Sequence, residues 1–370
     1  MPERHARFSP SSADRYIHCP PSLSLGEQYG PKDTSTIYTR EGTEAHALGE
    51  YLLRQAIGQS MEDPRPKMQF YNQEMQDAAE GYRDTVLELL ETIPGATLYI
   101  EQEVDFSEYV QGSYGTSDAL IIGSGKMLVI DLKYGRIEVG AEENSQLKCY
   151  ALGAYRAFSP LYDITSIDLI IYQPRIGNFS RWGLTTEDLL SWADTVLRPA
   201  GRLALAGGGE QATGPWCRFC KAKAVCRKRA EENLTLARYD FARPPVLEDD
   251  EVNLILGQLP ALESWASDIR EYALQRAMGG YAWDDWKLVE GRTVRRFTDE
   301  DAVAKAVQEA GFDPYERKLL GITALTALLG KARFNEIVAP LMEKSQGAPT
   351  LAPRSDKRPE LFIANNITSA

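Results

Sequence analysis

The feature that most constrains the fold is an expected β-hairpin that carries two aspartates. Residues 117–122 and 127–133 have the length and composition of strands, and Gly123-Ser124-Gly125-Lys126 between them is a favourable turn sequence. A two-residue loop in its centre would pair the first residue of this turn with the last. Residue numbers of antiparallel partners keep a constant sum, so the same register sets Asp118 directly opposite Asp131.

Two facing carboxylates repel each other, and a divalent cation between them would remove that cost. Lys133 follows Asp131 by two residues and therefore points to the same face of the sheet. Such a patch suits phosphodiester hydrolysis, because carboxylate oxygens hold Mg²⁺ or Mn²⁺ and a lysine can orient an attacking water. The hairpin therefore predicts a metal-dependent hydrolytic site.

A surface hairpin with an ordinary Asp131–Lys133 ion pair is the alternative. The residues around Asp131 argue against it, since they form an apolar run of Leu128, Val129, Ile130 and Leu132. Such a run is typical of a strand in a sheet covered on both faces. Carboxylates in that setting need a compensating partner. On the preceding strand Glu101 and Glu103 could also reach the site, although solvent-facing positions are the more common outcome for such residues.

The order of the expected elements indicates an α/β core followed by a helical region. Residues 1–40 are expected to be irregular, apart from a short segment, 11–16, that could begin a helix. Helical spacing of apolar residues and strand-like runs then predict the following segments: helices at 43–56, 73–91 and 142–158, strands at 97–106, 117–122, 127–133 and 167–173, and helices at 299–310, 322–329 and 334–342. We expect one domain over residues 1–235 and a mostly helical extension over 236–370.

The net charge of −12 opposes DNA binding by the chain as a whole. Phosphate binding depends on local patches, however, and residues 218–229 contain six basic residues and no acid. No apolar run approaches the roughly 20 residues of a membrane span, and residues 1–7 lack the apolar core of a signal peptide. These features predict a protein of the bacterial cytoplasm, without a membrane partner. There, five cysteines are metal ligands or free thiols more often than disulfides.

Four short motifs follow one another along the first half of the chain. They are Gly42-Thr43-Glu44-Ala45-His46, Gly115-Thr116-Ser117-Asp118, Asp131-Leu132-Lys133 and Gln146-Leu147-Lys148-Cys149-Tyr150. Their order and spacing resemble the GxxxH, GxxD, (D/E)xK and QxxxY motifs of RecB-like PD-(D/E)XK nucleases, over roughly residues 40–175. The resemblance implies a restriction-endonuclease-like core, which is a central mixed sheet flanked by helices.

The resemblance also implies a role for each motif residue. His46, Asp118 and Asp131 would bind Mg²⁺ or Mn²⁺ together with the backbone carbonyl of Leu132. Lys133 would be the catalytic lysine. Gln146 and Tyr150, one helical turn apart, would contact that lysine or the DNA backbone near the scissile phosphate. A histidine in a helix is more often a partly buried polar residue than a ligand, and the motif is what favours the ligand role for His46.

Three cysteines lie in a short segment, Cys217-x2-Cys220-x5-Cys226, and Cys19 can supply a fourth thiolate. One of these cysteines lies before the nuclease motifs and three lie after them. This distribution resembles that of the cysteines in the iron–sulfur staple of AddB-type and CRISPR-adaptation nucleases. That resemblance implies a [4Fe–4S] cluster with a structural role. Zn²⁺ on the same thiolates, with His18 involved, is the alternative. Cys149 lies in the expected helix 142–158 and is interpreted as a small buried apolar residue.

The C-terminal third offers a second, weaker indication of DNA binding. Two tryptophans, Trp283 and Trp286, precede Arg292, Arg295 and Arg296. Aromatic and basic side chains together can stack on and clamp single-stranded DNA, although core tryptophans beside a solvated basic strand are at least as common. The chain as a whole resembles an uncharacterised phage and prophage family that shares the tail segment 355–359.

Two classes of function follow from these features. The first is a DNA exonuclease that resects DNA ends in phage recombination, replication or repair, beside a single-strand annealing protein; a structure-specific endonuclease belongs to the same class. The second is a non-catalytic DNA-binding or assembly module. Because Asp118, Asp131 and Lys133 are all present, we expect the enzyme.

Overall fold

The computed structural model describes residues 6–30, 37–235, 247–289, 299–309, 314–315 and 320–342. The chain divides into two units, Met1–Ala273 and Leu274–Ala370. The boundary expected after residue 235 stays a prediction. Within the described residues, no helix is both long enough and apolar enough to span a membrane.

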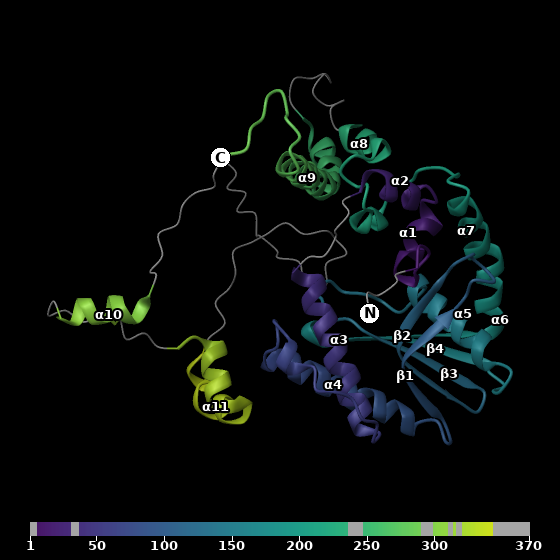
Figure 1. Ribbon diagram of the computed structural model, residues 1–370, viewed down its shortest axis with the longest axis horizontal. Helices are drawn as coiled ribbons and strands as arrows, with labels where there is room; N and C mark the ends of the chain where they lie inside the picture. The colour runs from purple at the N-terminus through teal and green to yellow at the C-terminus, as the bar shows by residue number, and fades with distance from the viewer. Residues whose placement is uncertain are drawn as a thin grey trace, which may run out of the picture. The chain divides into compact units, whose positions relative to one another are not determined.

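The first unit is built on a five-stranded mixed sheet, which confirms the expected α/β class (Figure 1). Its strands follow chain order: β1 (Thr97–Asp105), β2 (Tyr114–Gly123), β3 (Lys126–Leu132), β4 (Ser166–Gln173) and β5 (Asn178–Thr185). The pairs β1–β2, β2–β3 and β4–β5 are antiparallel. The pair β3–β4 is parallel, so the chain must cross over between these two strands, and it does so through helix α5 (Ser145–Phe158).

Helices cover both faces of the sheet, as the apolar run in β3 predicts. One face packs against α3 (Ile37–Ala56) and α4 (Gln73–Glu91), with Leu53 and Tyr82 in the core. The other face packs against α5, α6 (Thr186–Trp192) and α7 (Arg198–Leu205), with a core that includes Leu147 and Leu189. In Figure 1 the sheet lies between these two groups of helices.

The predicted hairpin register is confirmed. Gly123 pairs with Lys126, and the ladder continues to Ala119 opposite Ile130. Gly125 has φ of 70°, the left-handed conformation that a tight two-residue loop requires and that glycine adopts without strain. The helix expected at 73–91 has those bounds in α4, and the other elements expected between 43 and 173 differ from the observed ones only at their ends.

The helix that segment 11–16 could begin is present as α1, but the expectation that the rest of residues 1–40 is irregular was wrong for the described part. The described part of this segment contains a 3-10 turn (Pro10–Ser12), α1 (Ala13–His18) and α2 (Ser22–Tyr29). These short helices pack on the core by burying Phe8, Tyr16 and Leu23. Strand β5 was not predicted, because its residues are mostly polar or partly exposed, as on a sheet edge.

Helices follow the sheet through the rest of the described chain. In the first unit α8 (Arg227–Leu234) follows the cysteine segment, and α9 (Asp249–Met278) runs across the division between the units. The second unit contains α10 (Glu300–Glu309) and α11 (Ile322–Ile337). Gly330, with φ of 71°, interrupts α11 at the point where two separate helices were predicted. The basic residues Arg292, Arg295 and Arg296 and the segment 355–359 lie outside the described residues.

Candidate functional site

The candidate site lies where strands β2 and β3 stop pairing. Their ladder ends at Ala119 and Ile130, one position before Asp118 and Asp131. Beyond this point β2 continues along β1, and β3 continues along β4. The two aspartates therefore occupy opposite positions just beyond the last paired residues of β2 and β3.

Asp118 joins three elements. Its Oδ1 atom lies 3.2 Å from Nδ1 of His46 on α3, and its Oδ2 atom accepts a hydrogen bond of 2.7 Å from the backbone N–H of Leu132 on β3. His46 reaches the sheet because the stripe on α3 that includes Ala45 and Leu48 is buried and fixes the helix in place. The structure thus brings His46 and the backbone N–H of Leu132 to Asp118, while the metal-binding role expected of His46, Asp118 and the Leu132 carbonyl stays a prediction.

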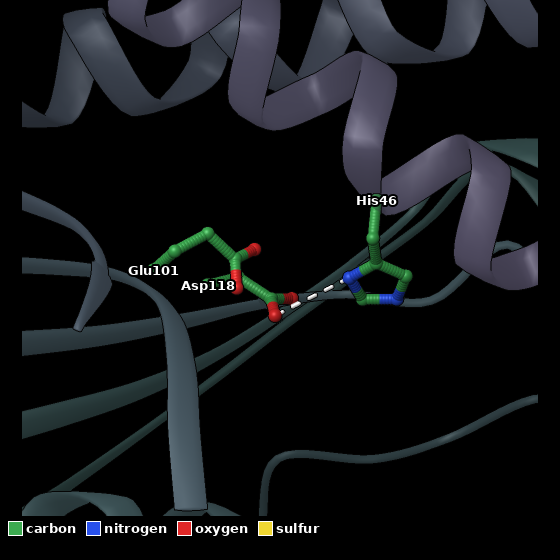
Figure 2. Close-up of side chains that lie close together, drawn as sticks. All are labelled: His46, Glu101 and Asp118. Atoms are coloured by element: carbon green, nitrogen blue, oxygen red, sulfur yellow. Dashed lines mark ion pairs between the residues drawn. The ribbon is translucent and has the colours of Figure 1, made fainter. Parts of the chain in front are cut away.

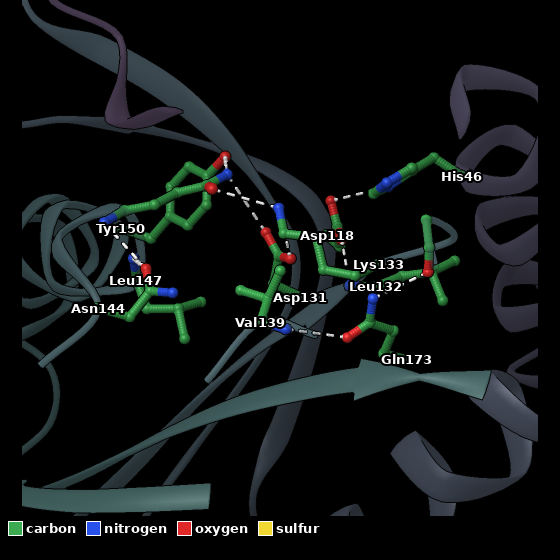
Figure 3. Close-up of polar contacts among 12 residues, drawn as sticks. His46, Asp118, Asp131, Leu132, Lys133, Val139, Asn144, Leu147, Tyr150 and Gln173 are labelled. Atoms are coloured by element: carbon green, nitrogen blue, oxygen red, sulfur yellow. Dashed lines mark hydrogen bonds and ion pairs between the residues drawn. The ribbon is translucent and has the colours of Figure 1, made fainter. Parts of the chain in front are cut away.

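Asp131 lies in a second group with the lysine and the residues of α5 (Figure 3). Its Oδ2 atom is 2.9 Å from Nζ of Lys133, an ion pair that leaves this buried oxygen without a hydrogen bond of good geometry. Lys133 Nζ also donates to Oε1 of Gln146 at 3.2 Å. The amide nitrogen of Gln146 donates to Tyr150 at 3.0 Å and, more weakly, to Asp131 Oδ1 at 3.4 Å.

The start of α5 explains why Gln146 points into the site. The side chain of Asn144 accepts hydrogen bonds from the backbone N–H groups of Gln146 and Leu147, both at 3.1 Å, and so caps the helix. This cap sets Gln146 in the first turn, directly above Lys133. Asn144 is a positioning residue that the motif comparison did not single out, although an asparagine before an apolar helical stripe is a recognisable cap signal.

On β1 the sequence offered both Glu101 and Glu103 as residues that could reach the site, and the structure brings Glu101 there. The β1–β2 register sets it opposite Asp118, between the pairs Ile100–Ala119 and Gln102–Ser117. Its φ of 49° is unusual for a residue other than glycine. One ligand atom each from His46, Glu101 and Asp118 lie within 4.8 Å of one another (Figure 2). Glu103, two residues along, is exposed.

Burial and mutual repulsion change the pKa values of these groups. Burial, and then Asp118, raise the pKa of Glu101 to about 8. Burial also raises the pKa of Asp131 against the effect of Lys133. Burial acts to lower the pKa of His46, but Asp118 and Asp131 outweigh it and raise that pKa to about 9. Asp118 has a lowered pKa, because His46 offsets the effect of burial.

Buried carboxylates with raised pKa values hold protons that a cation could replace. The donors fit Mg²⁺ or Mn²⁺, since they are carboxylate oxygens with one imidazole nitrogen. Lys133, whose pKa is raised because Asp131 outweighs burial, keeps its charge beside them. The arrangement combines a candidate cation site with a fixed ammonium group, which suits reactions that develop negative charge on oxygen.

The four candidate cluster cysteines, Cys19, Cys217, Cys220 and Cys226, line one small cavity. None of them forms a disulfide. The partly buried Arg15 also lines this cavity and donates a hydrogen bond of 2.5 Å to the carbonyl of Phe219 in the cysteine segment. The ring of His18 stacks on Trp216 at 4.2 Å. Cys149 is buried in α5, as expected.

A family model described as "Protein of unknown function (DUF2800)" matches residues 5–359 of the chain. Among solved structures, one titled "Crystal structure of SSO0001" matches with 16% sequence identity and a TM-score of 0.22. That match covers 50% of this chain and 98% of the other. A TM-score of this size supports no particular fold.

Proposed function

The chain belongs to the family described as Protein of unknown function (DUF2800), and we propose that it is a metal-dependent DNA nuclease with a PD-(D/E)XK core. The observation that carries the proposal is the position of Asp118 and Asp131. They lie at the point where β2 and β3 part, with Lys133 on β3 beside them. Lys133 and His46 compensate these buried carboxylates only in part, since Asp131 Oδ2 lacks a hydrogen bond of good geometry, and a divalent cation would complete the compensation.

Each side chain at this site suits a step in phosphodiester hydrolysis. A divalent cation on the carboxylates would supply Lewis acidity and stabilise charge on the phosphate oxygens. Lys133 is placed to orient the attacking water and to stabilise negative charge as the phosphorus–oxygen bond breaks. Gln146 holds the lysine in position through its Oε1 atom, and Tyr150 fixes the amide of Gln146 in turn.

DNA is the proposed substrate because of the four motifs and the basic cysteine segment. In that segment Arg218, Lys221, Arg227 and Lys228 are exposed in a chain whose net charge is −12. Exposed basic groups concentrated in one segment can neutralise phosphates even when the net charge of the chain is negative. We propose that the enzyme is an exonuclease acting on DNA ends in phage recombination, replication or repair, with a single-strand annealing protein as a partner and the cytoplasm as its location.

We propose that the cysteine cavity holds a [4Fe–4S] cluster. In a zinc site, a Zn–S bond of about 2.3 Å would set tetrahedral thiolates roughly 3.8 Å apart. Among the described residues the group that meets a 4.8 Å limit is His46, Glu101 and Asp118, so no three of the cysteine sulfurs are that close. A four-iron cluster holds each thiolate on a separate iron and needs the wider spacing. The partly buried guanidinium of Arg15 also suits a negatively charged cluster.

Digestion of linear DNA labelled at either end tests the proposed activity. Protein purified without oxygen should degrade it with Mg²⁺ or Mn²⁺, and the order of fragments gives the polarity. Lys133→Ala should lose cleavage and keep DNA binding. Lys67→Ala, which removes an exposed lysine paired with Glu62, is the matched control and should cut as the wild type does.

Covalently closed circular DNA separates the two nuclease classes, because an exonuclease requires an end. Cleavage of the circle would favour the structure-specific endonuclease. A wild-type protein that binds DNA but cuts neither substrate with either metal would overturn the nuclease proposal in favour of a DNA-binding module.

A further inference from the structure

We infer that Gln173, the last residue of β4, is a positioning residue for the proposed reaction. Its side chain fixes residues 135–140, which connect the strand that carries Lys133 to the helix that carries Gln146. This inference rests on the proposed function, because Lys133 and Gln146 act in that reaction. It adds a residue from β4, an element that contributes to none of the four motifs.

The connection 135–140 needs support because the side chains on either side of it must meet. Nζ of Lys133 donates to Oε1 of Gln146 at 3.2 Å. Between them, residues 135–140 form neither helix nor strand, and most of them are exposed. Arg136 pairs with Glu74 at 3.3 Å, but an ion pair between such exposed side chains stabilises little. A connection of this kind is mobile unless its backbone is held from elsewhere.

The side chain of Gln173 holds that backbone. It is fully buried, and its amide nitrogen donates to the carbonyls of Gly135 and Ile137 at 2.8 and 2.7 Å. Its Oε1 atom accepts hydrogen bonds from the N–H of Val139 and from Nδ2 of Asn178, both at 3.1 Å. Figure 3 shows the contact with Val139. The amide thus uses both donors and both acceptor positions, which neither a carboxylate nor an apolar side chain could do.

The same end of β4 also holds the backbone of Lys133. The N–H of Lys133 donates to the carbonyl of Tyr172 at 2.9 Å, one residue before Gln173. Two consecutive residues of β4 therefore fix both the backbone of Lys133 and the chain that leads from it towards Gln146. This arrangement sets the start of α5 relative to the end of β3.

Strand β5 supports the far end of the connection. Nδ2 of Asn178 donates to the carbonyl of Val139 at 2.9 Å, so both backbone polar groups of Val139 are held. The N–H of Ala141 donates to Oγ of Ser180 at 2.9 Å. Gln173 is the member of this network that reaches three residues of the connection, so its loss should loosen the connection most.

Gln173→Met tests the inference, because it keeps the length of the side chain and removes its hydrogen bonds. The carbonyls of Gly135 and Ile137 and the N–H of Val139 lose their partner, which is costly for groups that face a buried side chain. Steady-state cleavage of linear DNA should show kcat lowered by up to about 100-fold, since small displacements of reacting groups cost that much. KM for DNA should change little.

Gln76→Met is the matched control. It replaces a buried glutamine on α4 whose side chain is hydrogen-bonded to Tyr71 and Glu80, and it should keep the kcat of the wild type. Thermal unfolding of both variants shows how much stability each has lost. If kcat fell in both variants in proportion to their loss of Tm, Gln173 would only stabilise the fold and the inference would be overturned.

A double-mutant cycle shows whether Gln173 acts through the contact between Lys133 and Gln146. Gln146→Leu should lower kcat by removing that contact. Gln173→Met added to Gln146→Leu should then have little further effect, because the contact that it supports is already lost. Reductions in kcat that multiply in the double variant would contradict the inference.

Hydrogen exchange separates this inference from the proposed function, because it needs no activity. The N–H of Val139 should exchange faster in Gln173→Met than in the wild type, and as in the wild type in Gln76→Met. Unchanged exchange at Val139 would overturn the support by Gln173 even in a protein that cuts DNA. A wild type that cuts no DNA would overturn the proposed function and the catalytic consequence, while faster exchange would still show that Gln173 holds the connection.

Discussion

Nδ1 of His46 and Oδ1 of Asp118 lie 3.2 Å apart and join helix α3 to the central sheet. The contact brings a nitrogen donor from one helical layer to carboxylates on the sheet, while Gln146 and Tyr150 approach from the helix on the other side. The site therefore depends on the helices that cover both faces of the sheet. Its residues can be substituted on one helix or strand at a time.

Glu101→Gln should stabilise the protein when no metal is present. Burial and Asp118 raise the pKa of Glu101 to about 8, so this carboxyl is mostly protonated in the folded protein at pH 7 and ionised in the unfolded chain. A side chain that cannot ionise should therefore raise the free energy of unfolding, by at least about 0.2–1 kcal/mol. Urea unfolding in EDTA measures the change, with Glu103→Gln as the exposed control. A variant less stable than the wild type in EDTA would mean that Glu101 has a structural role.

Mn²⁺ should stabilise the wild type, because it binds the folded protein and not the unfolded chain. At a concentration 100 times the Kd, one bound ion adds about 2.7 kcal/mol to the free energy of unfolding. Asp118→Asn should lose most of this gain, since Asp118 is one of the two aspartates proposed to hold the cation. Thermal unfolding with and without Mn²⁺ measures the effect, and an equal rise in Tm in both proteins would place the cation elsewhere.

The sequence predicted the hairpin and the relative places of Asp118, Asp131 and Lys133 because these depend on local rules. Turn chemistry sets the β2–β3 register, and that register sets Asp118 against Asp131. The place of Lys133 follows from alternation along β3. These relationships need no knowledge of how distant segments pack.

The sequence named Glu101 and Glu103 together as candidates and, for a physical reason, could not decide between them. The place of Glu101 depends on the β1–β2 register, and residues 106–113 between these strands form a longer connection whose turn type the sequence does not define. Its positive φ also departs from regular strand geometry. The packing of residues 8–29 was missed in the same way, since short helices such as α1 gain their stability from distant contacts of Tyr16 and Leu23.

Gly115→Ala should impair the site through packing, without changing any ligand. A Cβ atom at this position would lie 2.6 Å from Cγ of Pro10 and 3.2 Å from the ring of Tyr150. Because Tyr150 holds the amide of Gln146, its displacement should lower kcat more than DNA affinity. Steady-state cleavage kinetics test this. Gly42→Ala, where a Cβ would meet no atom within 4 Å, is the control and should behave as the wild type.

Substitution of any one of Cys19, Cys217, Cys220 and Cys226 by serine should remove the cluster. Cys149→Ser should retain it, because Cys149 lies in α5 and does not line the cysteine cavity. Metal analysis of protein purified without oxygen should give about four irons per chain and visible charge-transfer absorption. About one zinc per chain and no such absorption would replace the iron–sulfur proposal with a zinc site.

Asp168 should make the stability of the sheet dependent on pH in the acid range. Its buried carboxylate lies 2.9 Å from Nζ of Lys126 and accepts a hydrogen bond of 3.0 Å from Nε of Arg181. Burial acts to raise the pKa of Asp168, but these two partners outweigh it and hold the pKa below its ordinary value. The unfolded chain therefore binds the proton more readily than the folded protein does. The ion pairs contribute fully above the unfolded pKa of about 3.9, and the contribution is lost as pH falls through the lower folded pKa.

Asp168→Asn should consequently reduce the free energy of unfolding at pH 7, by about 1–2 kcal/mol. This is less than the roughly 3–5 kcal/mol expected for a fully buried pair, because both cationic partners are partly exposed and can reach water. The difference between wild type and variant should shrink as pH falls below about 4. Urea unfolding across pH 3 to 7 measures it, with exposed Asp77→Asn as the control. A difference that stays constant over that range would show that Asp168 stabilises the sheet by packing and not by charge.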